Sequence, residues 1–132
     1  MLKLTRKVEY ALIALRHMQA MKPGKLTSAK EIAEAYGLPQ QLLAKTLQQM
    51  ARDRIIEAVQ GPSGGYRILS NLDKISLKDF FEKLEGPLGI MDCYFDSDCV
   101  QIGACNIRVP IQRINENMRN MFSKMSLREV TQ

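Results

Sequence analysis

The chain has 132 residues, of which 45% are apolar and 25% charged, and this composition predicts one compact globular domain with at most an appended arm. No apolar run approaches the roughly 18 residues that span a membrane, and the first residues do not match a signal peptide. An odd cysteine count of 3 without such a signal argues against a disulfide framework and predicts a cytoplasmic protein with no membrane partner.

Positive charge is concentrated in the first half of the chain. Residues 1–70 carry 11 Lys/Arg and 5 Asp/Glu, whereas residues 71–132 carry 8 and 9. A basic first half predicts contact with a polyanion such as double-stranded DNA, provided that the local architecture agrees. Lysines scattered over a solvated face are the alternative, and charge alone does not separate the two.

The chain begins with two predicted helices. Apolar residues at three- and four-residue spacing predict an amphipathic helix over 3–21, and Pro23-Gly24 then opens a turn. A capping box formed by Ser28 and Glu31 starts a short second helix, and Gly37 suits the left-handed residue that ends it. The expected apolar positions of this second helix are Ile32, Ala33 and Tyr36.

A third helix is expected after Pro39, which suits a first helical turn because its missing N–H would be unpaired there. One side of this helix is apolar, and the opposite side is polar or basic without an acid. The apolar stripe is Leu43, Leu47 and Met50. The opposite stripe is Gln41, Lys45, Gln48 and Arg52.

The periodicity then changes to that of a β-hairpin. Residues 55–59 and 66–69 are predicted strands, joined by the glycine- and proline-containing segment 60–65. A short helix, a tight turn, a longer helix and a hairpin in this order predict a winged helix-turn-helix. We therefore expect a mainly α fold with a small β-hairpin wing.

Two more helices are predicted downstream. Ser76 and Asp79 form a capping box for a helix that carries Leu77, Phe80, Phe81 and Leu84 and stops at Gly86-Pro87. From residue 107, Ile and Met recur every three to four residues in a long amphipathic helix, followed by a short tail. Such a helix after a DNA-binding head predicts a homodimer, and closure of the monomer's own core is the alternative.

The cysteines lie together in one polar segment. Cys93, Cys99 and Cys105 are separated by five residues each, among aspartates and glycine rather than apolar side chains. Structural thiols prefer apolar surroundings, whereas thiolates on a glycine-containing segment suit zinc or an iron–sulfur cluster. Three ligands are one short of the usual four. We divide the chain into a winged helix-turn-helix DNA-binding domain (1–85), a cysteine loop (86–106) and a dimerisation helix with its tail (107–132).

Other classes of protein explain less of the sequence. A metalloprotein without a regulatory role would account for the cysteines but not for the basic head and the wing. A regulator that uses thiols or zinc, without an iron–sulfur cluster, stays open as an alternative. One histidine, no glycine-rich phosphate loop and no nucleophile motif argue against an enzyme.

Four motifs in chain order resemble those of the winged-helix bacterial regulators that bind iron–sulfur clusters, the NsrR/IscR-like family. The resemblance covers essentially the whole chain, although Gln60 stands where the family commonly has arginine. It implies a transcription regulator, expected to be a repressor, whose cluster senses nitric oxide, redox state or iron supply. The motifs are the opening segment 4–12, the wing segment 61–66, the three cysteines and the tail segment 126–130.

The resemblance also implies a fourth ligand. In 2Fe–2S members a histidine three residues after the third cysteine completes the set, but Arg108 stands there in this chain. In the 4Fe–4S nitric oxide sensor an acidic residue near the start of the first helix comes from the partner subunit, and Glu9 occupies that position. The implied site is a 4Fe–4S rather than a 2Fe–2S cluster. Rival fourth ligands are His17, Asp92, Asp96 and Asp98.

The winged helix-turn-helix predicts which residues meet DNA. Gln40, Gln41, Lys45 and Gln48 of the third helix are expected at base edges and phosphates in the major groove. Positioning contacts to the backbone are expected from Thr5, Arg6 and Lys7, and from Ser63, Tyr66 and Arg67 in the wing. A dimer predicts a partly palindromic operator with half-sites about one helical turn apart or a multiple of that.

Overall fold

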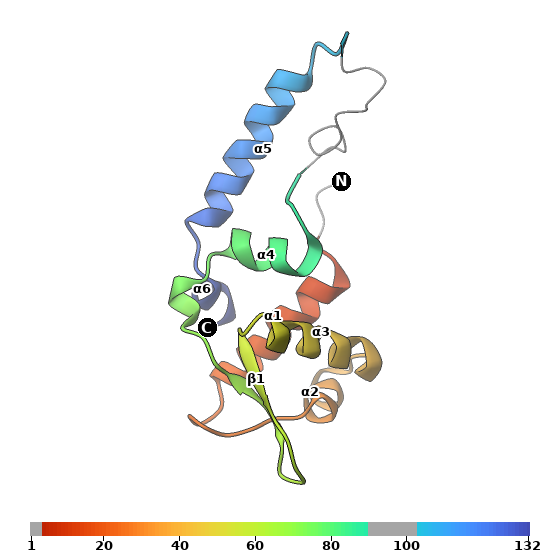
Figure 1. Cartoon of the computed structure of the whole chain (residues 1–132), viewed down its shortest axis with the longest axis vertical. Helices are drawn as coiled ribbons and strands as arrows, with labels where there is room; N and C mark the ends of the chain where they lie inside the picture. The colour runs from red at the N-terminus through yellow and green to blue at the C-terminus, as the bar shows by residue number, and fades with distance from the viewer. Residues whose placement is uncertain (1–3, 90–102) are drawn as a thin grey trace.

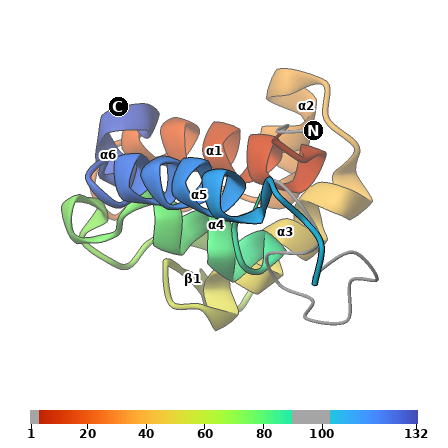
Figure 2. The same ribbon diagram turned by 90° about the horizontal axis from the view of Figure 1, so that it is seen from above.

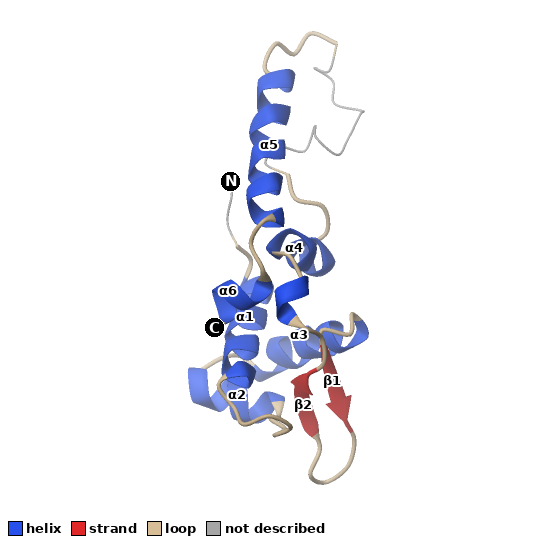
Figure 3. Ribbon diagram, turned by 90° about the vertical axis from the view of Figure 1, so that its left-hand side faces the viewer, coloured by secondary structure: helices blue, strands red, loops and turns tan. Residues whose placement is uncertain are grey.

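A computed structural model of the chain describes residues 4–89 and 103–132 and confirms the mainly α fold with a two-stranded hairpin (Figure 1). The long helix α5 extends away from the predicted DNA-binding domain (the head), and the hairpin lies at the opposite end of the molecule (Figures 1 and 3). In chain order the elements are α1 (Arg6–Gln19), α2 (Ala29–Tyr36), α3 (Gln40–Arg52), β1 (Ile56–Val59), β2 (Gly65–Ile68), the 3-10 turn η1 (Leu72–Lys74), α4 (Leu77–Glu85), α5 (Arg108–Ser123) and α6 (Leu127–Thr131).

Side-chain caps set the beginnings of most helices. The Ser28 and Ser76 hydroxyls each accept a hydrogen bond of 3.1 Å from the backbone N–H three residues later, which confirms both predicted caps. The Glu31 carboxylate accepts from the Thr27 hydroxyl at 3.1 Å. Thr5 caps α1, so this helix begins at Arg6 rather than at residue 3. Leu4 therefore precedes the helix and is 54% exposed.

The turn between α2 and α3 has the predicted left-handed glycine. Gly37 has φ of 65°, and Pro39 is the N-cap of α3, one residue before the helical turn in which it was expected. The predicted burial of Tyr36 is wrong, because this side chain is 48% exposed. Its hydroxyl lies 2.8 Å from Nδ1 of His17 on α1. A tyrosine can place its ring at an apolar edge while its hydroxyl finds a polar partner outside the core.

The core lies where α1, α2, α3 and α4 meet the hairpin. Leu43, Leu47 and Met50 are fully buried, as the apolar stripe of the third predicted helix required. The predicted apolar face of α4 is also buried, including Phe80. This packing fixes which side of α3 remains outside.

The hairpin is anchored to the segment before α2. The two strands are antiparallel, with Ile56 opposite Ile68 and Val59 opposite Gly65. Thr27 pairs with Tyr66 through two backbone hydrogen bonds of 3.0 and 2.6 Å. A Cβ at Gly65 would lie 2.7 Å from the Thr27 carbonyl oxygen, so this close approach requires glycine. The wing is therefore held against the α1–α2 connection.

The C-terminal part of the chain returns to the head. The α6 helix packs against α1 and η1, and the Gln19 amide donates to the Thr131 hydroxyl. Seen from above, α5 runs over α4 (Figure 2). Phe122 of α5 meets Phe81 of α4 edge to face, with ring centroids 5.4 Å apart. In the described residues, no helix is long and apolar enough to cross a membrane.

Candidate DNA-binding surface and metal ligands

The outward face of α3 brings together the residues predicted to read DNA. The side chains of Gln40, Gln41, Lys45 and Gln48 are all exposed. The helix cannot turn this face inward, because Leu43, Leu47 and Met50 are fully buried on the other side. The face offers amide groups and one ammonium group, which are the side-chain types that pair with base edges and phosphates.

The predicted wing residues lie in three different environments. Ser63 is exposed near the tip of the hairpin, whereas Tyr66 is half-buried and fixed through its backbone. Arg67 is exposed, but its Nε is paired with the Glu57 carboxylate directly across the hairpin. Ser63 is thus the most accessible of the three, and Arg67 would exchange an acidic partner for a phosphate.

Two of the residues predicted to contact DNA from the first helix have partners within the molecule. The Thr5 hydroxyl donates to the Glu85 carboxylate at 2.6 Å, and the Lys7 ammonium donates to the Leu84 carbonyl at 3.3 Å. Arg6 is exposed, with 76% of its side chain accessible and Glu9 at 3.7 Å. The structure thus places Thr5 and Lys7 beside the last turn of α4.

The last turn of α4 is held from two sides of the head. Gln49 of α3 donates from Nε2 to the Lys83 carbonyl at 2.9 Å, next to the Leu84 carbonyl that Lys7 reaches. The last carbonyls of a helix have no partner inside it, and a lysine there also suits the negative end of the helix dipole. Sequence reasoning missed Gln49. This clamp (Thr5, Lys7 and Gln49 on the last turn of α4) lies directly before the cysteine loop.

The structure describes part of the predicted metal site. Cys105 is a half-buried free thiol, whereas Cys93 and Cys99 lie outside the described residues. Glu9 is exposed on α1 and lines a shallow depression with Leu4, Thr5 and Arg6. Its ion pair with Arg6 is long and solvated, and such pairs contribute little, so the carboxylate is accessible to a ligand. Within residues 4–89 and 103–132, no group of three His, Cys, Asp or Glu side chains is gathered for a metal.

Two further positions bear on the fourth ligand, whereas the rival ligands Asp92, Asp96 and Asp98 lie outside the described residues. Arg108 begins α5, and its guanidinium is a cation rather than a metal ligand. His17 lies next to Tyr36, where its Nδ1 shares a hydrogen bond with the tyrosine hydroxyl. Thiols together with one accessible carboxylate would suit an iron–sulfur cluster, because soft sulfur ligands select such clusters.

The exposed face of α5 carries an apolar row. Ile107, Ile114 and Met121 are spaced by seven residues, and they are 48%, 52% and 53% exposed. The same helix turns Asn115 and Phe122 toward the monomer, and Arg119 forms an ion pair of 2.9 Å with Glu82 on α4. The side of α5 that carries Asn115, Arg119 and Phe122 is therefore the side that packs on α4.

Comparison with known proteins identifies the family and the fold. The family model Rrf2, described as an iron-dependent transcriptional regulator, matches residues 4–132. The structure of CymR (YrzC), the global cysteine regulator of B. subtilis, is similar with a TM-score of 0.73 at 22% identity, over 99% of this chain and 97% of that one. Staphylococcus aureus CymR gives 0.73 at 21% identity, over 97% of each chain.

A third solved structure is also similar. T. potens IscR gives a TM-score of 0.71 at 20% identity, over 96% of this chain and 83% of that one. At these identities the structural likeness shows the fold alone. The family match covers nearly the whole chain and confirms the prediction of a regulator rather than an enzyme. The chain belongs to the Rrf2 family of transcriptional regulators.

Proposed function

We propose that this chain is a homodimeric, cytoplasmic repressor that binds a partly palindromic operator through α3 and the β1–β2 hairpin. One observation carries the DNA-binding part. The apolar stripe of α3 is fully buried, while Gln41, Lys45 and Gln48 remain exposed on the same helix. A helix of this kind in a winged helix-turn-helix enters the major groove with its N-terminal residues at the base edges.

The exposed row on α5 supports the homodimer. A seven-residue apolar spacing is typical of helices that pair side by side, and Ile111 and Met118 add the positions four residues after Ile107 and Ile114. Burying such side chains stabilises association by roughly 25 cal/mol for each Å² of apolar surface. We infer that α5 packs on α5 of a second copy.

The proposed signal site is an iron–sulfur cluster, with 4Fe–4S favoured over 2Fe–2S. Its ligands would be Cys93, Cys99 and Cys105 of one protomer and the partner subunit's Glu9. The exposed carboxylate of Glu9 and the arginine at position 108 support this choice over a histidine-completed set. When bound, the cluster would supply iron that nitric oxide or an oxidant can reach, because a carboxylate is displaced more easily than a thiolate.

The clamp on α4 offers a route from the cysteine loop to the DNA surface. Residue 86 follows α4 directly, and the Lys83 carbonyl in its last turn accepts from Gln49 on α3. A change in the loop that shifts this turn would therefore change the position of α3. A ligand shifts such an equilibrium only by its differential affinity for the two arrangements.

A regulator that uses its thiols directly is the second candidate. The similar structures include both CymR, described as a cysteine regulator, and IscR, so the fold alone does not separate the two mechanisms. Both candidates use the same cysteines. They differ in whether iron and sulfide are present.

Anaerobic purification tests the two candidates. The proposal predicts a coloured protein with visible absorbance, stoichiometric iron and sulfide, and loss of both after Cys105→Ser. A colourless anaerobic protein, with zinc or without metal, would favour the thiol-based candidate.

Binding to DNA enriched by the protein from a random-sequence pool tests whether the protein is a DNA-binding regulator. Absence of salt-dependent binding to any duplex would contradict the regulator.

A further inference from the structure

The connection between α1 and α2 contains a hydrogen-bonded turn with a lysine at each end. The Lys25 N–H donates to the Lys22 carbonyl at 3.1 Å, and Gly24 between them has φ of 82°. Proline followed by a glycine of positive φ is the pattern of a type II turn, in which the first and last residues lie close together. The turn thus holds two exposed lysines side by side.

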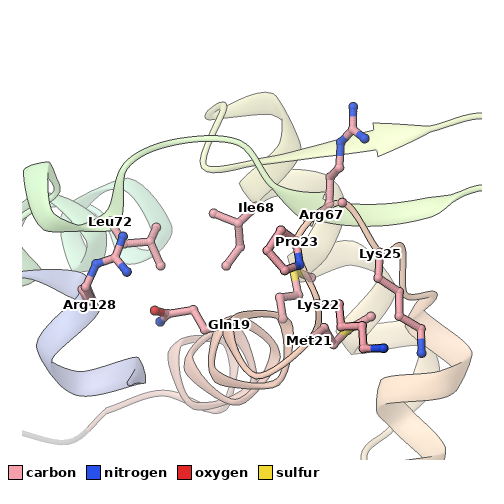
Figure 4. A pocket seen from close by; sticks show the side chains of 11 residues that line it. Gln19, Met21, Lys22, Pro23, Lys25, Arg67, Ile68, Leu72 and Arg128 are labelled. Carbon is pink, nitrogen blue, oxygen red and sulfur yellow. The ribbon is translucent and has the colours of Figure 1, made fainter.

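This lysine turn is fixed to the wing. Thr27, two residues after Lys25, forms both backbone hydrogen bonds with Tyr66 of β2. Lys22 and Lys25 also share a hollow with Arg67 and Ile68 of the same strand. In Figure 4 both lysine side chains point away from the Arg67 guanidinium, and Figure 3 shows the connection running beside β2. The position of the lysines therefore follows that of the wing.

The cations around the hollow do not converge on one point. Arg67 points away from the hollow toward its partner Glu57, and Arg128 lies at the opposite end, 3.0 Å from Asp73 (Figure 4). A small anion would need groups that converge, whereas an extended polyanion needs cations spread along a surface. The residues that line the hollow include no acid, so nothing there neutralises Lys22 and Lys25.

We propose that Lys22 and Lys25 form a phosphate-binding pair that contacts the DNA backbone beside the wing. The inference rests on the proposed DNA-binding function and extends the contact surface beyond α3 and the hairpin tip. Contacts of this type position a protein on the duplex and carry no sequence information. Each neutralised phosphate releases a counterion, so the pair should appear in the salt dependence of binding.

The test compares charge-matched variants on one duplex of about 40 base pairs, enriched from a random pool by the wild-type protein. In the Lys22→Gln/Lys25→Gln variant, the slope of log affinity against log salt should become shallower by about 0.9 for each lost phosphate contact. The affinity of this variant at low salt should fall by at least about tenfold. Discrimination against a scrambled duplex should not change. Lys74→Gln/Lys124→Gln removes the same charge from exposed positions outside the hollow and should keep the wild-type slope.

Lys22→Arg/Lys25→Arg retains both charges and should bind as the wild type does, which a merely structural role of lysine would not predict. The inference is overturned alone if the wild type binds and the glutamine pair matches the Lys74/Lys124 control in slope and affinity. A wild-type protein that binds no duplex overturns the proposed function together with the inference. The two failures are therefore distinguishable.

Discussion

Lys45 and Gln49 lie one turn apart on α3, but their side chains meet different surroundings. Lys45 is exposed on the face that we assign to DNA, whereas Gln49 is half-buried and donates to the Lys83 carbonyl. The sequence predicts a role for Lys45 because it repeats with Gln41 and Gln48 at helical spacing. It gives no signal for Gln49, because the partner is 34 residues away and joins it only through tertiary packing.

Replacing Lys45 with alanine should weaken operator binding by about 1–3 kcal/mol, because a charged contact to a base or phosphate is lost. Equilibrium titration against the enriched duplex measures the change, with Lys124→Ala, at an exposed position after α5, as the control. An affinity equal to that of the wild type would contradict the placement of α3 in the groove.

Replacing Glu9 with alanine should accelerate loss of the cluster, because the proposed fourth ligand disappears. The fold should change little in stability, by about 0.5 kcal/mol or less, since the ion pair with Arg6 is exposed. Decay of visible absorbance under anaerobic conditions with an iron chelator measures the effect. Glu34→Ala, an exposed acid on α2, is the matched control. Equal decay in both variants would assign the ligand role to another residue.

At the scale of elements, the sequence predicts those helix ends, turns and strands that depend on residues close together in the chain. Serine caps, the left-handed Gly37 and the change from helical to strand periodicity place the α2–α3 turn and the hairpin within about one residue of their observed bounds. The clamp on α4 was not predictable, because the Thr5–Glu85 hydrogen bond joins residues 80 positions apart. The burial of Tyr36 was mispredicted because a two-turn helix has too few residues to define its buried face.

Replacing Gln49 with alanine removes one arm of the clamp. The free energy of unfolding should fall by about 0.5–1.5 kcal/mol, the usual contribution of one hydrogen bond. The ratio of operator affinities between cluster-loaded and cluster-free protein should move toward one, because α3 is less firmly tied to α4. Chemical denaturation and operator titration measure the two effects, with Asn120→Ala as the control. Lower stability with an unchanged ratio would leave Gln49 a structural role only.

At the scale of the whole molecule, we propose that the head binds DNA and that α5 packs on a second copy. The Ile and Met spacing predicts a long amphipathic helix, and the structure adds which of these side chains remain outside the monomer. The packing of α6 on α1 has no such signal. The tail is short, and its place depends on residues far away in sequence, such as Gln19 and Ile75.

Replacing Ile114 with glutamate should dissociate the homodimer, because a charge would enter the centre of the apolar row. Sedimentation should show a monomer, and the variant should keep its helical content. Operator binding should weaken because two linked heads no longer act together. Asn120→Glu adds the same charge elsewhere on α5 and should remain dimeric. A dimeric Ile114→Glu variant would place the subunit interface elsewhere.

The central claim is that the presence or absence of a cluster on the three cysteines determines how the two DNA-binding domains of the dimer bind DNA. The most direct measurement is operator affinity under anaerobic conditions, with the visible spectrum recorded on the same sample before and after removal of iron. We predict that the absorbance and the affinity change together, and that Cys105→Ser has the affinity of the iron-free protein throughout. A sample without a chromophore, or an affinity that stays the same when the chromophore is lost, would contradict the claim.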